Sequence, residues 1–229
     1  MGNDGFNLYN SSNSKINNSV VNTTNGYGVF LSSNANWNNV TNCNVTTSGS
    51  YGYGIFLSSS SNYNALFGNN ITVFNALANG IFCSASNYLT SINDAITQRG
   101  TGLTSTVLLY LCVGGSFQNT NISALSASGA GSGGINLQGV NNILFNNVSV
   151  YTTAGAGIYF GSTASNNVSV NNSYLSTTTG AVDRQDTISN ASFFNTLFNS
   201  TTGTQNLFNT AGYGITNLTN CTFNKSSVS

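Results

Sequence analysis

Short apolar stretches alternate with polar corners along the whole chain, and the apolar stretches recur at a nearly constant interval. The clearest copies open with a glycine, namely Gly5, Gly28, Gly54, Gly80, Gly134 and Gly157. Their spacings are 23, 26, 26, 54 and 23 residues, so the interval of 54 holds two units. We assign residues 108–111 to the strand of the skipped unit, and Gly180 opens a further one. Such a period predicts a solenoid of stacked repeats.

Each unit continues with a Ser/Asn turn, a second short strand, an Asn-rich corner and a third short strand, as in residues 39–46, 69–73 and 146–150. Three strands this short cannot bury an apolar face alone, so consecutive units must stack. Asn suits the corners because it tolerates left-handed backbone and its amide can bond to its copy in the next coil. We therefore predict an all-β parallel β-helix of about nine coils, each of about 23–28 residues, with residues 1–229 as one domain.

Stacking predicts which side chains point inward and which point outward on the first strand of each coil. One inward column is Val29, Ile55, Ile81, Ile135 and Ile158, and the next is Leu31, Leu57, Cys83, Leu111, Leu137 and Phe160. The outward column between them is Phe30, Phe56, Phe82, Tyr110, Asn136 and Tyr159. A contiguous apolar strip on a surface is usually covered. We interpret its aromatic members as a binding or interface surface, covered by a second copy of the chain, by a loop or flanking domain, or by stacked sugar rings.

These units resemble the repeats of the right-handed parallel β-helix superfamily, which includes the pectate-lyase-like enzymes. In their Asn-rich character they are most similar to repeat proteins of archaeal and bacterial surfaces. The resemblance runs from Gly5 to Phe223. It implies the fold more firmly than the function, because the same scaffold carries lyases, hydrolases, adhesins and phage spikes. The face of the first strand in this chain resembles the polysaccharide groove of the lyase-like families.

Charged residues make up only 3% of the chain, against about a quarter in ordinary proteins, and the net charge is zero. No basic patch is available for nucleic acid or an anionic membrane surface. No apolar run is long enough to insert into a membrane. The chain has no His, which removes serine–histidine catalysis and the commonest metal ligand. We expect no metal and no cofactor, with weak calcium binding at an acidic corner as the alternative.

The resemblance implies that enzymes of this superfamily cluster charged side chains on an exposed strand face, and residues 183–186 (Asp-Arg-Gln-Asp) form the one dense cluster here. Asp183 and Asp186 are the weak catalytic candidates, able to act as acid and base if their carboxyl groups lie about 5–9 Å apart. The alternative is a local salt bridge in a solvated corner, and we interpret Asp94 and Arg99 in the same way. We expect that the chain is not an enzyme.

The four cysteines are expected to be free thiols. Cys43 and Cys221 occupy matching places in units that are seven coils apart, about 33 Å at the strand spacing. A disulfide needs Cα atoms within about 7 Å, so these two cannot pair within one chain. Cys83 falls in an inward column, and Cys112 is expected to point outward on the next coil. The alternative is an intermolecular disulfide through Cys43 or Cys221 in an oxidising setting.

Fifteen Asn-x-Ser/Thr sequences mark potential glycans if the chain is secreted. The main candidates are Asn22, Asn44, Asn70, Asn121, Asn147, Asn167, Asn199 and Asn217. We therefore predict an extracellular or cell-surface location. The favoured hypothesis is a structural module of a fibre, sheath or stalk that forms a homo-oligomer or filament, end to end or laterally. The alternatives are a carbohydrate-binding or adhesion module, a polysaccharide lyase or hydrolase, and an ice-binding solenoid.

Overall fold

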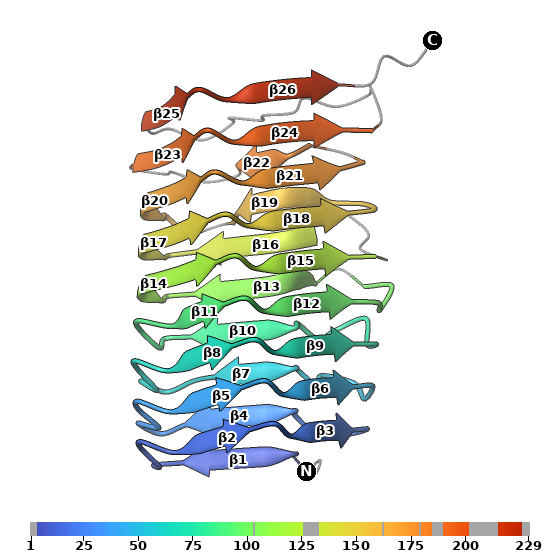
Figure 1. Cartoon of the computed structure of the whole chain (residues 1–229), viewed down its shortest axis with the longest axis vertical. Coiled ribbons are helices and arrows are strands. Elements are labelled where there is room, and N and C mark those ends of the chain that lie inside the picture. The colour runs from blue at the N-terminus through green and yellow to red at the C-terminus, as the bar shows by residue number, and fades with distance from the viewer. Residues whose placement is uncertain are drawn as a thin grey trace.

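The chain folds as a parallel β-helix, which confirms the predicted all-β solenoid (Figure 1). The structure is a computed structural model that describes residues 4–102, 104–125, 133–161, 163–178, 180–184, 190–201 and 215–225. Within these ranges the strands form three parallel sheets, called A, B and C, of eight, nine and nine strands. Successive coils climb from the N-terminus at the bottom of Figure 1 to β26 at the top. In the described ranges no helix has the length and apolar character that a membrane crossing requires.

Each coil supplies one short strand to each sheet. Sheet A contains β1 (Phe6–Tyr9), β4 (Val29–Ser32), β7 (Ile55–Leu57), β10 (Ile81–Ser84), β13 (Ser105–Tyr110), β16 (Gly133–Gln138), β19 (Ala156–Phe160) and β22 (Val182–Arg184). Sheet B contains β2 (Lys15–Asn17), β5 (Asn39–Thr41), β8 (Ala65–Phe67), β11 (Thr90–Ile92), β14 (Val113–Gln118), β17 (Asn141–Asn146), β20 (Asn166–Asn171), β23 (Asn190–Phe194) and β25 (Ile215–Thr219). Sheet C contains β3 (Val20–Thr23), β6 (Asn44–Thr47), β9 (Asn70–Val73), β12 (Ala95–Gln98), β15 (Asn121–Ala124), β18 (Ser149–Thr152), β21 (Tyr174–Thr177), β24 (Leu197–Ser200) and β26 (Thr222–Lys225).

The predicted inward columns of sheet A are confirmed except at one coil. Ile55 and Ile81 are direct register partners, and both are fully buried. In the next column Cys83 pairs with Leu109, whereas the sequence predicted Leu111. Leu111 is 43% exposed and adopts a left-handed backbone with φ of 54°. Because this coil has no glycine at its start to mark the register of its leucine run, the predicted register is wrong by two residues.

The corner between sheets B and C, called the B–C corner, places one residue of every coil in the left-handed region. These residues are Asn18, Asn42, Gly68, Asn93, Asn119, Asn147, Asn172, Asn195 and Asn220. Asn and Gly are the residues that accept this conformation at least cost. The predicted amide ladder is present in part, because Asn147 Nδ2 donates to Asn119 Oδ1 at 2.8 Å and Asn195 Nδ2 donates to Asn172 Oδ1 at 2.9 Å.

The next residue of each coil forms a second column inside the B–C corner, where its side chain faces the core. The column is Ser19, Cys43, Asn69, Asp94, Thr120, Val148, Ser173, Thr196 and Cys221. Side-chain oxygens here accept backbone N–H groups of the preceding coil, as from Cys43 N to Asn69 Oδ1 at 3.0 Å. Polar side chains in this column therefore satisfy backbone donors that would otherwise be buried without partners.

Candidate functional site

The outer face of sheet A carries one column of side chains that changes from apolar to polar along the axis. In register order it is Asn7, Phe30, Phe56, Phe82, Leu108, Asn136, Tyr159 and Asp183. The prediction that Tyr110 belongs to this column is wrong, because Tyr110 pairs with Ser84 and Gln138 two positions further along the strands. Leu108 takes its place. Tyr110 still lies at an exposed position of sheet A, with 38% of its surface accessible.

The apolar half of this column is an aromatic cluster rather than a bare strip. Phe56 stacks on Phe30 at 5.1 Å between ring centroids and on Phe82 at 4.9 Å. Tyr27 and Tyr53, which precede the strands of their coils, pack edge-on against these rings. Burial raises the pKa of both tyrosines, so their phenols stay protonated at neutral pH. The chain itself therefore covers part of the strip.

The polar half of the column places Tyr159 and Asp183 in adjacent coils as direct register partners. Burial, and then the negative charge of Asp183, raises the pKa of Tyr159, so the phenol remains a hydrogen-bond donor at neutral pH. Asn136 lies one coil before Tyr159 and is 7% exposed. Its Oδ1 accepts a hydrogen bond from Gln138 Nε2 at 3.2 Å. Asp186 lies outside the described residues. The arrangement therefore places a carboxylate and a phenol side by side on one strand face, groups that can form hydrogen bonds with hydroxyl groups and transfer a proton.

The position of Asp183 differs from the one that the glycine spacing predicts. Counting from Gly157 and Gly180 would align Asp183 with Phe160, which points inward. The observed register instead pairs Val182 with Ile158 and Asp183 with Tyr159. This shift of one residue brings the carboxylate to the outer face of sheet A.

The sequence predicted that Asp94 lies in a solvated corner, and this prediction is wrong. Asp94 is 1% exposed and belongs to the core-facing column of the B–C corner. Its carboxylate accepts hydrogen bonds from Asn69 and Ser91. It is therefore part of the packing of the helix and not of a surface site. Among the described residues, no three metal-ligating side chains of the His, Cys, Asp or Glu type gather together.

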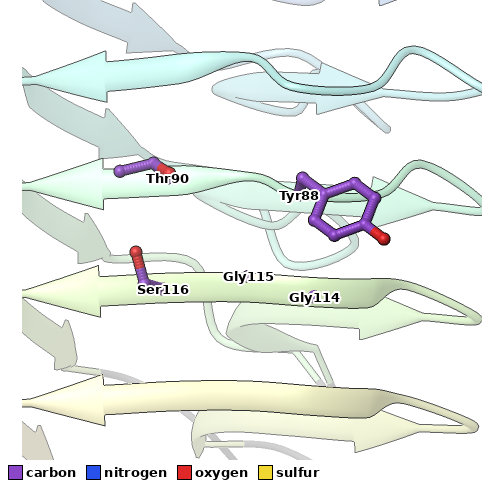
Figure 2. A pocket seen from close by; sticks show the side chains of 5 residues that line it. All are labelled: Tyr88, Thr90, Gly114, Gly115 and Ser116. Carbon is purple, nitrogen blue, oxygen red and sulfur yellow. The ribbon is translucent and has the colours of Figure 1, made fainter.

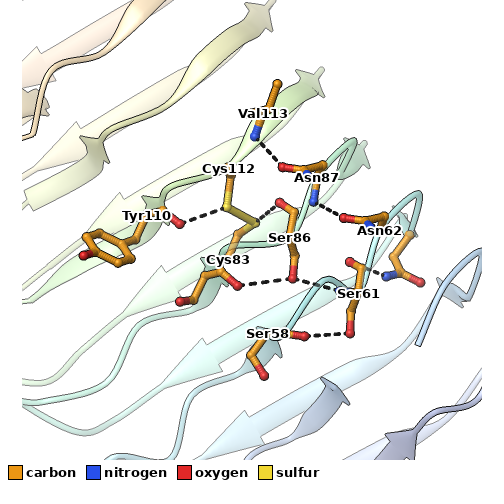
Figure 3. Close-up of a disulfide and its surroundings, with 11 residues drawn as sticks. Ser58, Ser61, Asn62, Cys83, Ser86, Asn87, Tyr110, Cys112 and Val113 are labelled. Carbon is orange, nitrogen blue, oxygen red and sulfur yellow. Dashed lines mark hydrogen bonds between the residues drawn. A yellow bond between two sulfur atoms is a disulfide. The ribbon is translucent and has the colours of Figure 1, made fainter. Parts of the chain in front are cut away.

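Cys83 and Cys112 form a disulfide between adjacent coils, which corrects the prediction of four free thiols (Figure 3). The left-handed conformation of Leu111 breaks the alternation of the strand, so the next side chain, Cys112, turns inward toward Cys83. Simple alternation would leave Cys112 outside. Cys43 and Cys221 form no disulfide within the chain and lie in one column, and a bond between molecules through either residue stays a prediction. Cys43 is only 2% exposed, whereas Cys221 is partly accessible, which makes Cys221 the better placed of the two for a bond between molecules.

A second aromatic feature, which the sequence analysis missed, lies at the corner between sheets A and B, called the A–B corner. Trp37, Tyr63 and Tyr88 stack in three consecutive coils, with ring centroids 4.2 Å and 4.6 Å apart and planes within 5° of parallel. They are 56%, 41% and 47% exposed. We call these three residues the corner stack. Each of the three follows an Asn, and they are 26 and 25 residues apart, so the sequence alone could have predicted that they lie at the same place in consecutive coils.

The glycosylation candidates lie on the outer surface of the helix. Seven of the eight are exposed, and Asn199 is half-buried. Asn44, Asn70 and Asn121 share one outward column of sheet C, where the serine or threonine two residues on also points outward. Asn147 and Asn167 lie at left-handed corner positions. Their modification stays a prediction.

Comparisons with known proteins support the fold. A family model described as a right handed beta helix region matches residues 1–71, and the predicted resemblance to the right-handed parallel β-helix superfamily is confirmed. No curated protein sequence gives a significant match. The A-module of a mannuronan C-5 epimerase from Azotobacter vinelandii is similar in structure, with a TM-score of 0.65 and 13% identity over 99% of this chain. The catalytic domain of a GH87 α-1,3-glucanase in complex with tetrasaccharides has a TM-score of 0.39 and 13% identity over 95% of the chain.

This chain spans 55% of the epimerase module and 57% of the glucanase domain. The epimerase module is an enzyme built on this fold, and this finding overturns the expectation that the chain is not an enzyme. At 13% identity the likeness itself establishes the fold alone. Any activity of this chain must therefore be argued from its own residues.

Proposed function

We propose that the chain binds a neutral polysaccharide along the outer face of sheet A and acts on it at Tyr159 and Asp183. The observation that carries this proposal is the register of β19 and β22, which stacks a carboxylate on a phenol at the polar end of an aromatic column. The half-exposed edges of the aromatic column give sugar rings an apolar surface to pack against, and carboxylate and phenol groups bind sugar hydroxyl groups. The likeness to the epimerase module supports a polysaccharide over the fibre, sheath or stalk predicted from the sequence.

In this proposal Asp183 is the general base and Tyr159 is a hydrogen-bond donor. Asp183 is half-buried on the outer face of sheet A, where its carboxylate can take a proton from a hydroxyl group or a water molecule. Because the pKa of Tyr159 is raised, its phenol keeps its proton and can hold an oxygen of the substrate next to the carboxylate. Asp186, three residues further along the chain, is the residue that the sequence offers as a partner acid.

The charge distribution favours a neutral glycan over a polyuronate. Mannuronan and its relatives carry a carboxylate on each sugar, and binding them calls for cationic side chains in the groove. The whole chain has four Lys and Arg residues, and the outward column of sheet A, as far as the structure describes it, contains none. The disulfide between Cys83 and Cys112 supports an extracellular location, because such bonds persist in oxidising compartments.

The test is to incubate the protein with a panel of neutral polysaccharides and to follow reducing ends and released oligosaccharides. Asp183→Asn should lower turnover by about a hundredfold or more, the range for losing a general base, while the substrate still binds. Tyr159→Phe should weaken both binding and turnover. Asp94→Asn, which changes an acid buried inside the B–C corner and away from the outer face of sheet A, is the matched control and should turn over substrate as wild type does. Equal turnover in Asp183→Asn and wild type would overturn the proposal.

A further inference from the structure

The corner stack holds three aromatic residues in a backbone conformation that aromatic residues avoid. Trp37, Tyr63 and Tyr88 have φ of 60°, 57° and 57°. For bulky side chains this region is a genuine outlier, and such strain concentrates at sites with a function. The same position in other coils is filled by Asn13, Asn142 and Asn167 or by a glycine, residues that fit it without strain. Three successive aromatic residues here are therefore not what the fold requires.

The stack ends at Gly114, which leaves the outer side of Tyr88 without a neighbouring side chain. The register is fixed by hydrogen bonds from Tyr63 N to Asn87 O at 2.9 Å and from Tyr88 N to Val113 O at 2.9 Å, so Gly114 occupies the next place in the column. A Cβ atom on Gly114 would lie 2.6 Å from Cδ1 and Cε1 of Tyr88. The ring of Tyr88 therefore lies directly over the backbone of Gly114, and any larger residue at position 114 would displace the ring.

A pocket of about 270 Å³ opens at this point. Figure 2 shows the ring of Tyr88 beside the Gly114–Gly115 segment of the next coil, with Thr90 and Ser116 further along the neighbouring strands. Thr90 and Ser116 are register partners, and their side chains are half-buried on the outer face of sheet B. The lining therefore combines one aromatic face, two hydroxyl groups and bare backbone, and it carries no charge.

We propose that this pocket binds one pyranose ring of a neutral glycan, with Tyr88 as the stacking platform and the hydroxyl groups of Thr90 and Ser116 as hydrogen-bond partners. A sugar ring has an apolar face for the phenol ring and equatorial hydroxyl groups for neutral polar side chains. The volume is just below the range of about 300–1,000 Å³ for drug-sized ligands, which suits a single ring. The pocket lies on sheet B, so this binding site is separate from the Tyr159–Asp183 site on sheet A.

A peptide partner fits these observations less well. Specific protein interfaces bury about 800 Å² on each partner around a largely apolar centre. Beside the corner stack, the adjacent outward column of sheet B is short or polar, with Asn39, Ala65, Thr90 and Ser116. Exposed aromatic rings flanked by hydroxyl groups instead match a sugar, which has both an apolar face and hydroxyl groups.

The experiment is calorimetric titration of the whole chain with neutral hexasaccharides of β-1,3-glucose, β-1,4-glucose and N-acetylglucosamine. A hexagalacturonate and a proline-rich hexapeptide serve as the charged and peptide probes. Trp37 is the only tryptophan of the chain, so its fluorescence gives a second readout for ligands that extend along the stack. We expect at least one neutral hexasaccharide to bind, and neither of the other two probes to compete with it.

Two variants remove the site in different ways. Tyr88→Ala removes the platform, and Gly114→Asn fills the pocket with the residue that Asn142 and Asn167 place at this corner. Each should weaken binding by about tenfold, the value of one stacked ring. Tyr151→Ala changes a tyrosine of similar exposure, 46%, on sheet C and should bind as wild type. Thermal unfolding of each variant establishes that it is folded before binding is compared.

Several results would overturn this site. They are an unchanged affinity in both Tyr88→Ala and Gly114→Asn, tighter binding of the hexapeptide than of any sugar, or no binding of any neutral hexasaccharide. Asp183→Asn should leave this binding unchanged. Loss of turnover in Asp183→Asn with unchanged binding tests the site on sheet A, and loss of binding in Tyr88→Ala tests the pocket on sheet B, so the two proposals can fail separately.

Discussion

Asp94 lies one coil after Asn69 inside the B–C corner, and its Oδ1 accepts both the backbone N–H of Asn69 at 2.7 Å and its side-chain Nδ2 at 3.0 Å. Ser91 Oγ donates to Oδ2 at 2.7 Å. Burial raises the pKa of Asp94, and these hydrogen bonds oppose the rise without cancelling it. A carboxyl group whose pKa is higher in the folded state holds its proton more tightly there than in the unfolded chain.

Asp94→Asn should therefore stabilise the protein at neutral pH. The ionised carboxylate destabilises the fold above its folded-state pKa, and this cost disappears as the pH falls through that value toward the unfolded one. Urea unfolding of both proteins across the acid to neutral range measures the difference, which should shrink as the pH falls. A variant that is less stable than wild type at neutral pH would show that the hydrogen bonds outweigh the burial.

The left-handed corner at Asn147 predicts an unusual order of substitutions. Asn147 has φ of 54° and donates Nδ2 to Asn119 Oδ1. Asn147→Ala should cost about 1–2 kcal/mol because the left-handed region penalises a Cβ atom, whereas Asn147→Gly loses only the exposed hydrogen bond. Asn44, an exposed residue of β6, is the control. There glycine should be the worse replacement, since a strand favours alanine over glycine. The same order at both positions would contradict the corner argument.

The sequence predicted those parts of the fold that repeat without interruption. The partnership of Ile55 and Ile81 follows from glycine spacing, because identical units stack in register. The prediction failed at Leu111, since a left-handed residue reverses the alternation and cannot be recognised when it is neither Asn nor Gly. Leu111 accounts for the missed disulfide at Cys112, whereas the misplaced column comes from the absence of an opening glycine in this coil. The aromatic corner stack was visible as spacing, but its backbone conformation and its open end at Gly114 needed the structure.

The disulfide should contribute substantially to stability. It joins Cys83 and Cys112 across a sequence separation of 29 residues, for which loop-closure entropy gives about 3–4 kcal/mol. The best replacement is Cys83→Leu with Cys112→Ser, since their columns carry Leu57 and Ser86 in neighbouring coils. Urea unfolding should show a loss of this size for the double variant and for reduced wild type. Adding a reductant to the double variant should change nothing, and an equal effect of the reductant on both proteins would place the bond elsewhere.

The aromatic cluster of sheet A should act mainly on the stability of the single chain. Phe56 stacks between Phe30 and Phe82 and meets the edges of Tyr27 and Tyr53. Phe56→Ser should cost about 1–3 kcal/mol, less than a fully buried phenylalanine, because the ring is half-exposed.

Phe67→Ser, on the outer face of sheet B at 44% exposure, is the control and should change stability by less than about 0.5 kcal/mol. Sedimentation of the same variants measures assembly size. Because two tyrosines of the same chain already cover the cluster, we expect Phe56→Ser to leave that size unchanged. If Phe56→Ser instead made the particle smaller and Phe67→Ser did not, a second copy of the chain would have to cover this face, and a glycan on sheet A would have to compete with it.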